Sequence, residues 1–274
     1  EGGRVSRLKS TYWQKYPPVQ IFGDMYEKGA LAALKAAHGT SRLMGRDLRE
    51  IGINVDCAPV LDVPVEGSND KILGDRTFAR NPHTVGALGA AICEGLLEEG
   101  VLPVVKHMPG HGRARVDSHF ELPEVDADLE TLKKTDFMPF KYLASAPWGM
   151  TAHVLYTAID AHKPASLSEK IIQDIIRDEI GFKGFLICDD LSMKALSGTL
   201  SDLTTEALAA GCDAVLHCNG DMDEMDMIAS AVEPLSARAM ERFVRGQEMR
   251  KRAVEHAPAF DYEATRSWLL EKTA

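Results

Sequence analysis

The chain has 274 residues, and its content of 45% hydrophobic and 26% charged residues is ordinary for a globular protein. The formal net charge of -10 argues against the basic surface that nucleic-acid binding requires, and no apolar run is long enough to span a membrane. The five cysteines are scattered without a close pair, which predicts reduced thiols in a reducing compartment instead of a disulfide framework or a zinc site.

Helical and strand patterns alternate along the chain. In order, they predict a helix over 24–50, a strand over 53–60, a helix over 82–99, a strand over 102–106 and helical stretches over 128–145. They continue with strand 149–153, helix 168–180, strand 184–189, helix 201–210, strand 214–217 and helices from 221 onward. Because the strands alternate with helices and show no hairpin signals, we expect a parallel sheet covered by helices, in one domain spanning 1–274.

Some ends of these elements carry their own signals. Asn81 and Pro82 are typical of the N-cap and first turn of a helix, and Gly52 ends the helix before the first strand. The segment 237–273 is charged and has a helical period, so we expect it to pack outside the sheet.

Polar side chains gather directly after the predicted strands. They are Asp62, Lys106, His107, His153, Asp189, Asp190, His217 and Asn219. The carboxyl ends of parallel strands meet at one edge, where both TIM barrels and open doubly wound sheets bind their ligands. The strand count leaves both architectures open, but it places the candidate site at that edge.

The stretch KHMPGHGRARVDSH (106–119) allows several interpretations. A metal site formed by His107, His111 and Asp117 would need the two histidines on one helix face, and the proline and glycines of 109–112 disfavour a helix. A phosphate loop would need glycines that lead directly into a helix N-terminus, and that continuation is missing.

The third interpretation of this stretch is an acid/base loop. Asp117 lies two residues before His119, so its carboxylate could hold one ring nitrogen and leave the other to transfer a proton near neutral pH. The alternative is an exposed Asp-Ser-His sequence without a role.

A buried strand delivers two adjacent carboxylates, Asp189 and Asp190, to its carboxyl end. Adjacent side chains on a strand point to opposite sides, so one can face a ligand site while the other caps the next helix. The first suits a nucleophile or a metal ligand. Helix capping by both carboxylates is the alternative.

Basic side chains near strand ends could hold a polar ligand. Lys106 and His107 follow an apolar strand, and Arg76 lies in a GDRTF segment, so all three could donate hydrogen bonds to hydroxyl or carbonyl oxygens. The alternative for Arg76 is an internal ion pair with Asp75 or Asp62.

Taken together, these segments resemble the family 3 glycoside hydrolases, in the bacterial β-N-acetylglucosaminidase (β-hexosaminidase) branch that recycles muropeptides. Seven blocks match in order along nearly the whole chain. They are EGGRVSR (1–7), NVDCAPVLDV (54–63), GDRTFARNP (74–82), KHMPGHGRARVDSH (106–119), MTAHVLY (150–156), ICDDLSMKAL (187–196) and AGCDAVLHCN (210–219).

The resemblance implies a TIM (β/α)8 barrel and roles for particular residues. Asp189 matches the nucleophile, His119 the general acid/base, and Asp117 the partner that tunes His119. The residues that match those holding the terminal sugar are Arg7, Arg76, Lys106 and His107. The implied substrate is a terminal β-linked N-acetylglucosamine on 1,6-anhydro-N-acetylmuramyl muropeptides. The implied protein is a cytoplasmic monomer that uses no metal or organic cofactor and binds neither nucleic acid nor membrane.

The implied chemistry is a retaining double displacement in which Asp189 attacks the anomeric carbon while protonated His119 gives its proton to the leaving oxygen. Neutral His119 then takes a proton from water to release the sugar, near its ordinary pKa of ~6.5. For the loop to reach over Asp189, we expect the glycines and proline of 109–112 to act as hinges.

The chain also departs from the family pattern. The family's first strand and helix, together with an aspartate that holds sugar hydroxyls, would precede Glu1, so we expect an N-terminally incomplete barrel with open edges. Cys188 and Met108 stand where a hydroxyl residue and an aromatic are common. The alternative functions are those of a family 3 β-glucosidase, a glycoside phosphorylase or a non-catalytic sugar-binding relative.

Overall fold

The structure, a computed structural model, describes residues 2–3, 5–9, 12–68, 73–118 and 120–273. Its main sheet has the strand order β1-β2-β4-β6-β7, and every neighbouring pair is parallel. These strands are β1 (Val55–Asp56), β2 (Leu102–Met108), β4 (Trp148–Thr151), β6 (Phe185–Asp190) and β7 (Ala214–Leu216). A second, two-stranded parallel sheet pairs β3 (Glu124–Val125) with β5 (Leu155–Tyr156).

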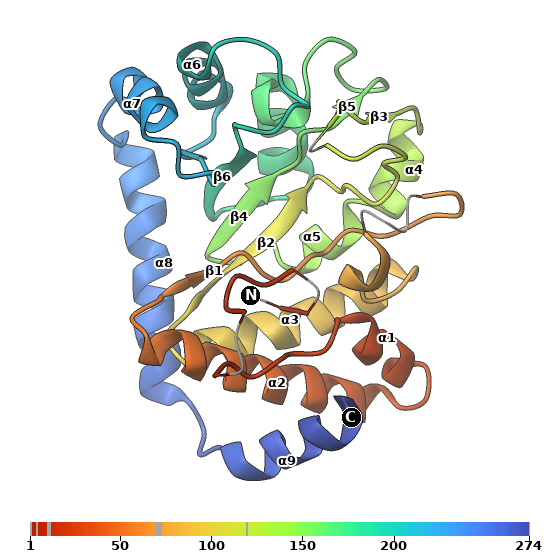
Figure 1. Cartoon of the computed structure of the whole chain (residues 1–274). Coiled ribbons are helices and arrows are strands. Elements are labelled where there is room, and N and C mark those ends of the chain that lie inside the picture. Colours follow the sequence, from red (N-terminus) through yellow and green to blue (C-terminus); the bar gives the residue numbers. More distant parts are fainter. Residues whose placement is uncertain (1, 4, 10–11, 69–72, 119, 274) are drawn as a thin grey trace.

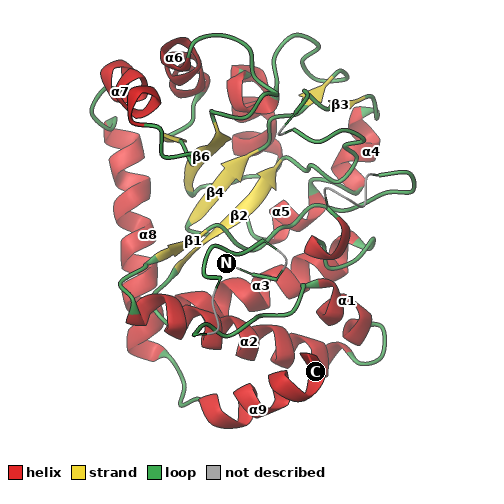
Figure 2. Cartoon of the chain, viewed as in Figure 1, coloured by secondary structure: helices red, strands yellow, loops and turns green. Residues whose placement is uncertain are grey.

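Helices surround the main sheet (Figures 1 and 2). The α-helices are α1 (Gln20–Tyr26), α2 (Ala30–Glu50), α3 (Pro82–Glu98), α4 (Leu129–Lys134), α5 (Met138–Tyr142), α6 (Leu200–Ala210), α7 (Met222–Ala231), α8 (Ala237–His256) and α9 (Tyr262–Thr273). Three further helical segments are η1 (Gly74–Arg76), η2 (Ala165–Leu167) and the π-type helix η3 (Ile171–Glu179). Within the residues that the structure describes, no helix is both long and apolar enough to cross a membrane.

The five predicted strands and their parallel order are confirmed, with ends that shift by a few residues. Two predicted helices are divided. The first, 24–50, is two helices because the chain turns at 27–29 between α1 and α2, and 128–145 holds the two short helices α4 and α5. Apolar periodicity continues across such a turn, so it does not reveal the break.

The predicted start of α3 is confirmed. Asn81 has an extended backbone, and its side-chain oxygen accepts hydrogen bonds from the N–H groups of His83 and Thr84, while Pro82 occupies the first turn. These bonds satisfy donors that the first turn of a helix leaves without partners. The cap fixes where α3 begins, and α3 then leads directly into β2 across Gly100.

The two faces of the sheet have different partners. In β6, Leu186 and Cys188 belong to the large apolar core beneath the helices, whereas Phe185 and Ile187 belong to a smaller cluster on the opposite face. This alternation is the two-residue period of a strand. Asp189 continues the series 185, 187, 189 and therefore emerges on the face opposite the large core.

Helix α8 covers part of that second face. Its Phe243 packs against Trp148 and Phe185, with ring centroids 5.9 and 5.8 Å away. Ala239 of the same helix is buried in the smaller cluster. The segment 237–273 thus packs outside the sheet as expected, although α8 also closes one end of the face on which Asp189 lies.

A buried ion network lies at the amino-terminal ends of the strands. Asp213, just before β7, accepts hydrogen bonds from Arg177 Nη2 at 3.1 Å, Arg242 Nη1 at 2.6 Å and Leu186 N at 2.9 Å. Arg177 comes from η3 and Arg242 from α8, so one carboxylate joins helices on both sides of β6.

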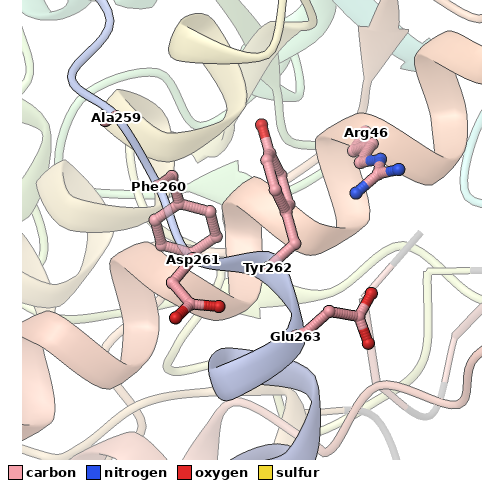
Figure 3. A pocket seen from close by; sticks show the side chains of 6 residues that line it. All are labelled: Arg46, Ala259, Phe260, Asp261, Tyr262 and Glu263. Atoms are coloured by element: carbon pink, nitrogen blue, oxygen red, sulfur yellow. The ribbon is translucent and has the colours of Figure 1, made fainter.

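Helix α9 is attached to α2 and α3 on the far side of the molecule. Tyr262 donates a hydrogen bond of 2.6 Å to Glu99 Oε1, which also accepts from the buried Arg42. The guanidinium of Arg46 lies 4.5 Å from the Tyr262 ring centroid, and Phe260 packs edge-to-face on the other side of that ring (Figure 3). This shallow hollow is lined by none of the predicted site residues.

Candidate active site

A cavity of about 510 Å³ opens at the carboxyl-terminal ends of the strands. Apolar residues of three strands line it, Val55 of β1, Met150 of β4 and Leu216 of β7. Five of the seven predicted site residues line it. They are Arg7, Arg76, Lys106, His107 and Asp189. The fold thus brings together groups that lie up to 182 positions apart (189 minus 7) in the sequence.

Asp189 points into this cavity because of its place on β6. Its side chain is 17% exposed, and its Oδ1 accepts a hydrogen bond from the Asp190 N–H at 2.9 Å. Burial acts to raise the pKa of Asp189, but the positive charges of His107, His153 and Lys106 outweigh that effect and lower the pKa. Asp189 is therefore ionised at neutral pH, as a nucleophile must be.

Asp190 has a different role from the one we expected. Its Oδ1 accepts hydrogen bonds from the N–H groups of Ser192 and Cys218, so it closes a turn and joins the loops that follow β6 and β7. The next helix, α6, begins only at Leu200 and is capped by Thr199. The prediction that the second carboxylate caps the next helix was wrong, because a turn of several residues separates the strand from that helix.

Asp62, fully buried in the loop after β1, holds the end of β2 and the segment that follows it. Its Oδ1 accepts from the main-chain N–H of His107 at 3.2 Å and of His111 at 2.7 Å, and its Oδ2 bonds His107 Nδ1 at 2.7 Å. Burial acts to raise the pKa of Asp62, but His107 and His111 outweigh it and lower the pKa to about 2. Asp62 is thus engaged by two histidines and not by Arg76, which was one alternative from the sequence.

His107 lies between the two carboxylates Asp62 and Asp189. Its Nε2 is 3.9 Å from Asp189 Oδ2, beyond hydrogen-bond distance, while Nδ1 is bonded to Asp62. Both His107 and Lys106 line the cavity beside Asp189. The arrangement places donors and a carboxylate around one polar opening above an apolar floor, which is the pattern of a site for a polar small molecule.

The segment 109–112 is not a hinge in this structure. Pro109 to Gly112 are all buried, the Gly110 carbonyl accepts from Tyr156 Oη at 2.8 Å, and the His111 N–H is bonded to Asp62. A Cβ added at Gly112 would lie 1.9 Å from the Val63 carbonyl oxygen. The glycine is therefore required for close approach of two chain segments, and the expectation of a flexible hinge is corrected.

The loop that follows is tied down on two sides at Ser118. Ser118 is buried, its Oγ lies 3.3 Å from His111 Nε2, and its carbonyl accepts from Ala195 N at 3.2 Å. Because Ala195 follows Asp189 in the loop after β6, these contacts hold Ser118 at the cavity, which it lines. The Asp117 carbonyl accepts from Phe120 N and Glu121 N in a tight turn. His119, the predicted acid/base, lies outside the described residues.

Two strand-end histidines flagged by the sequence do not line the cavity. His153 is fully buried and bonds Ser166 Oγ at 2.8 Å and the Asp190 carbonyl at 3.0 Å, and burial lowers its pKa. His217 bonds Glu224 Oε2 at 2.7 Å, on the side of α7. Both residues follow parallel strands, but their side chains are engaged by protein partners and do not belong to the cavity lining.

The cavity is also lined by groups to which the sequence gave no role in catalysis or sugar binding. Asp56, His111, Asp190, Cys57 and Cys218 line it. The only sequence signal for Asp56 is its place on a strand with apolar neighbours, and nothing distinguishes the two thiols from the other free cysteines. Over the described part of the chain, no three His, Cys, Asp or Glu side chains are grouped so as to hold a metal ion.

Comparisons with known proteins agree with this arrangement. The model of the glycosyl hydrolase family 3 N-terminal domain matches residues 1–249. A β-hexosaminidase of Chromobacterium violaceum is 37% identical over 249 residues, which are 89% of this chain and 69% of that protein. A β-hexosaminidase of Nitrosomonas eutropha is 35% identical, with 85% of this chain and 67% of that protein covered.

Solved structures show the same fold. The structure of NagZ from Neisseria gonorrhoeae in complex with N-trifluoroacetyl-D-glucosamine superposes with a TM-score of 0.86 at 31% identity. The match covers 100% of this chain and 80% of that one. Native NagZ from the same organism gives a TM-score of 0.85. The curled parallel sheet is thus part of a TIM barrel, as the resemblance to the family implied.

Proposed function

The chain belongs to glycosyl hydrolase family 3 as a glycoside hydrolase of the β-hexosaminidase type, and on this premise we propose that it removes terminal β-linked N-acetylglucosamine with Asp189 as its nucleophile. The observation that carries the proposal is an ionised carboxylate at the end of β6, beside Lys106 and His107, in a cavity at the carboxyl ends of the strands. Active sites of TIM barrels lie at this end of the sheet.

Asp189 attacks the anomeric carbon and forms a covalent glycosyl-enzyme, which water then hydrolyses with retention of configuration. A lowered pKa suits this step, because the attacking carboxylate has to be ionised at the working pH. The neighbouring main-chain N–H of Asp190 bonds Oδ1, which leaves Oδ2 to face His107 and the cavity.

His119 supplies the proton for the leaving oxygen and later takes one from water, and Asp117 holds its ring. Two contacts of Ser118 support this assignment, because they hold the residue between Asp117 and His119 at the cavity. Acid/base help of this kind contributes ~10²–10⁴-fold to the rate.

The sugar is held by Arg7, Arg76, Lys106 and His107. All four line the cavity. The two arginines and Lys106 can donate hydrogen bonds to hydroxyl or carbonyl oxygens, and His107 Nε2 can accept from a hydroxyl when the ring is neutral and donate when it is protonated. A β-hexosaminidase of the same fold, NagZ from Neisseria gonorrhoeae, has been crystallised with N-trifluoroacetyl-D-glucosamine, which supports an N-acylated glucosamine as the terminal residue. The substrate we propose is a muropeptide with 1,6-anhydro-N-acetylmuramic acid, handled by a cytoplasmic monomer whose residues 1–274 form one catalytic domain.

Hydrolysis of an aryl β-N-acetylglucosaminide by the wild-type protein and by Asp189→Ala tests the nucleophile. We expect the substitution to lower kcat roughly 10⁴-fold or more, because the covalent route is lost. Added azide should restore part of the rate and yield the α-glycosyl azide, since a small anion then occupies the space of the missing carboxylate.

The matched control is Asp213→Asn, which alters a buried carboxylate at the opposite end of the sheet. It should leave the rate per folded molecule within about twofold, as expected for a distant and independent site. An Asp189→Ala protein that keeps its activity would exclude Asp189 as nucleophile, and a rate that depends on phosphate would indicate a phosphorylase.

A further inference from the structure

The geometry points to Asp62 as a positioning residue of the reaction, which keeps the proton of His107 on Nδ1 and so presents Nε2 to the cavity and to Asp189. The inference rests on the proposed function for its effect on catalysis. Asp62 itself lies outside the lining of the cavity and acts through His107.

The two oxygens of Asp62 have separate partners. Oδ1 accepts from two main-chain N–H groups, those of His107 and His111, and Oδ2 is bonded to the His107 ring at 2.7 Å. Asp62 is fully buried, so these contacts are not shared with solvent. Three hydrogen bonds of this kind hold a buried carboxylate in one orientation. The bond from Oδ2 to Nδ1 then sets the orientation of the His107 ring.

An ionised carboxylate can only accept hydrogen bonds, and the pKa of Asp62 lies at about 2. His107 Nδ1 must therefore carry a hydrogen, whether the ring is neutral or protonated. The second nitrogen, Nε2, lies 3.9 Å from Asp189 Oδ2, a gap that leaves room for a substrate hydroxyl to approach both groups. A carboxylate that orients a histidine in this way sets which nitrogen meets the substrate.

Replacement of Asp62 by asparagine moves the hydrogen of the neutral His107 ring from Nδ1 to Nε2. The hydrogen bonds from the main-chain N–H groups are kept. The two buried N–H groups need an acceptor, so the amide oxygen of the new side chain takes the place of Oδ1. The amide NH₂ group then takes the place of Oδ2 and donates to His107 Nδ1, which has to be free of its hydrogen. The hydrogen of the neutral ring moves to Nε2, where it faces Asp189.

The test is the protonation of the His107 ring, followed by NMR of the protein labelled with ¹⁵N-histidine in the wild type and in Asp62→Asn. We expect Nδ1 to carry a hydrogen in the wild type and to lack it in the variant, and kcat/KM to fall roughly 10²-fold. The His107 signal is assigned by its loss in His107→Gln.

Two further measurements separate positioning from loss of structure. Asp213→Asn, the matched buried carboxylate, should leave the protonation of the His107 ring unchanged, and kcat/KM per folded molecule should stay within about twofold of the wild-type value. In a His107→Gln background, Asp62→Asn should lower kcat/KM by no more than about another twofold, because its effect passes through His107.

Several results would overturn the inference. One is a wild-type protein in which His107 Nδ1 lacks a hydrogen, a measurement that needs no variant. Others are an unchanged His107 signal in Asp62→Asn, or a full 10²-fold loss that persists without His107. The NMR result does not depend on turnover, so failure of the proposed function would leave it intact, whereas failure of the inference would leave the Asp189→Ala result intact.

Discussion

Two buried carboxylates, Asp62 and Asp213, lie at opposite ends of the same sheet and have opposite kinds of partner. Asp213 accepts from two arginines and a main-chain N–H at the amino ends of the strands. Asp62 accepts from a histidine ring and two main-chain N–H groups at the carboxyl ends, beside the cavity. Each carboxylate connects several strands, helices or loops, so both stabilise the tertiary structure of the domain.

The difference lies in whether the partner can change its charge. An arginine keeps its proton at any working pH, so the Asp213 network is the same in every state of the protein. A histidine can gain or lose a proton near neutral pH. The proposed chemistry therefore lies at the end of the sheet where the partner of the buried carboxylate is a titratable residue type, while the partners at the other end stay charged. The following predictions test this contrast.

The largest effect on stability is expected for Asp213→Asn. The change leaves Arg177 and Arg242 without their shared carboxylate, and breaking a buried pair of this kind costs ~3–5 kcal/mol in the free energy of unfolding. Urea unfolding at neutral pH measures it. A loss below ~1 kcal/mol, the usual contribution of an exposed ion pair, would show that this network does not stabilise the domain as a buried ion pair does.

His111 is expected to have a smaller, pH-dependent effect on the free energy of unfolding. Burial lowers the pKa of His111 to about 4, so between pH 6.5 and 4 the unfolded chain binds a proton that the folded protein does not. The free energy of unfolding should therefore fall by about 3 kcal/mol as the pH is lowered through this range. His111→Gln should remove that part of the slope, as measured by urea unfolding at a series of pH values.

Asp62 loses its contribution to stability at a lower pH than His111. Its pKa is lowered to about 2, so its contribution is present above the ordinary value of 3.8 and is lost as the pH falls from there to 2. That loss should become smaller in His111→Gln but should not disappear, because His107 still lowers the pKa of Asp62. A slope between pH 6.5 and 4 that is the same with and without His111 would contradict the assignment.

The smallest effect is expected for Tyr262→Phe, far from the strand ends. The substitution removes the hydrogen bond to Glu99 and keeps the ring that packs between Arg46 and Phe260. We expect a loss of ~1 kcal/mol in the free energy of unfolding, because Glu99 keeps its bond to Arg42. Hydrolysis by the variant should be unchanged, and a lower kcat would indicate that α9 affects the cavity.

Local patterns in the sequence predicted the elements correctly where one short segment contains the whole cause. The cap at Asn81 and the five strands are of this kind, because capping and strand periodicity act over a few residues. The break between α1 and α2 was not predicted, because the apolar period continues across it. The gap between β6 and α6 was predicted, but the bond that Asp190 accepts there from Cys218 was not, because it depends on a distant segment.

The candidate site was predicted in its residue types and only partly in its geometry. Strand ends and family blocks indicated Asp189, Lys106 and His107, which the fold brings around one cavity. The sequence interpreted 109–112 as a hinge because glycine and proline are typical of mobile loops. The structure shows that Gly112 is there for close packing against Val63. The sequence does not distinguish a glycine in a mobile loop from a glycine at a close contact, because only the neighbours in space differ.

The sequence by itself determined the strands, their parallel order, the family and the position of Asp189 at the end of a strand. Periodicity, strand ends and ordered sequence motifs are properties of the linear chain, so they can be read without a structure. Tertiary structure alone decided that Asp62 pairs with His107, that Ser118 is held by His111 and Ala195, and that Asp190 joins two loops. Hydrogen bonds and charge interactions act over a few ångströms in space. Two residues 45 positions apart, such as Asp62 and His107, meet only when the chain has folded.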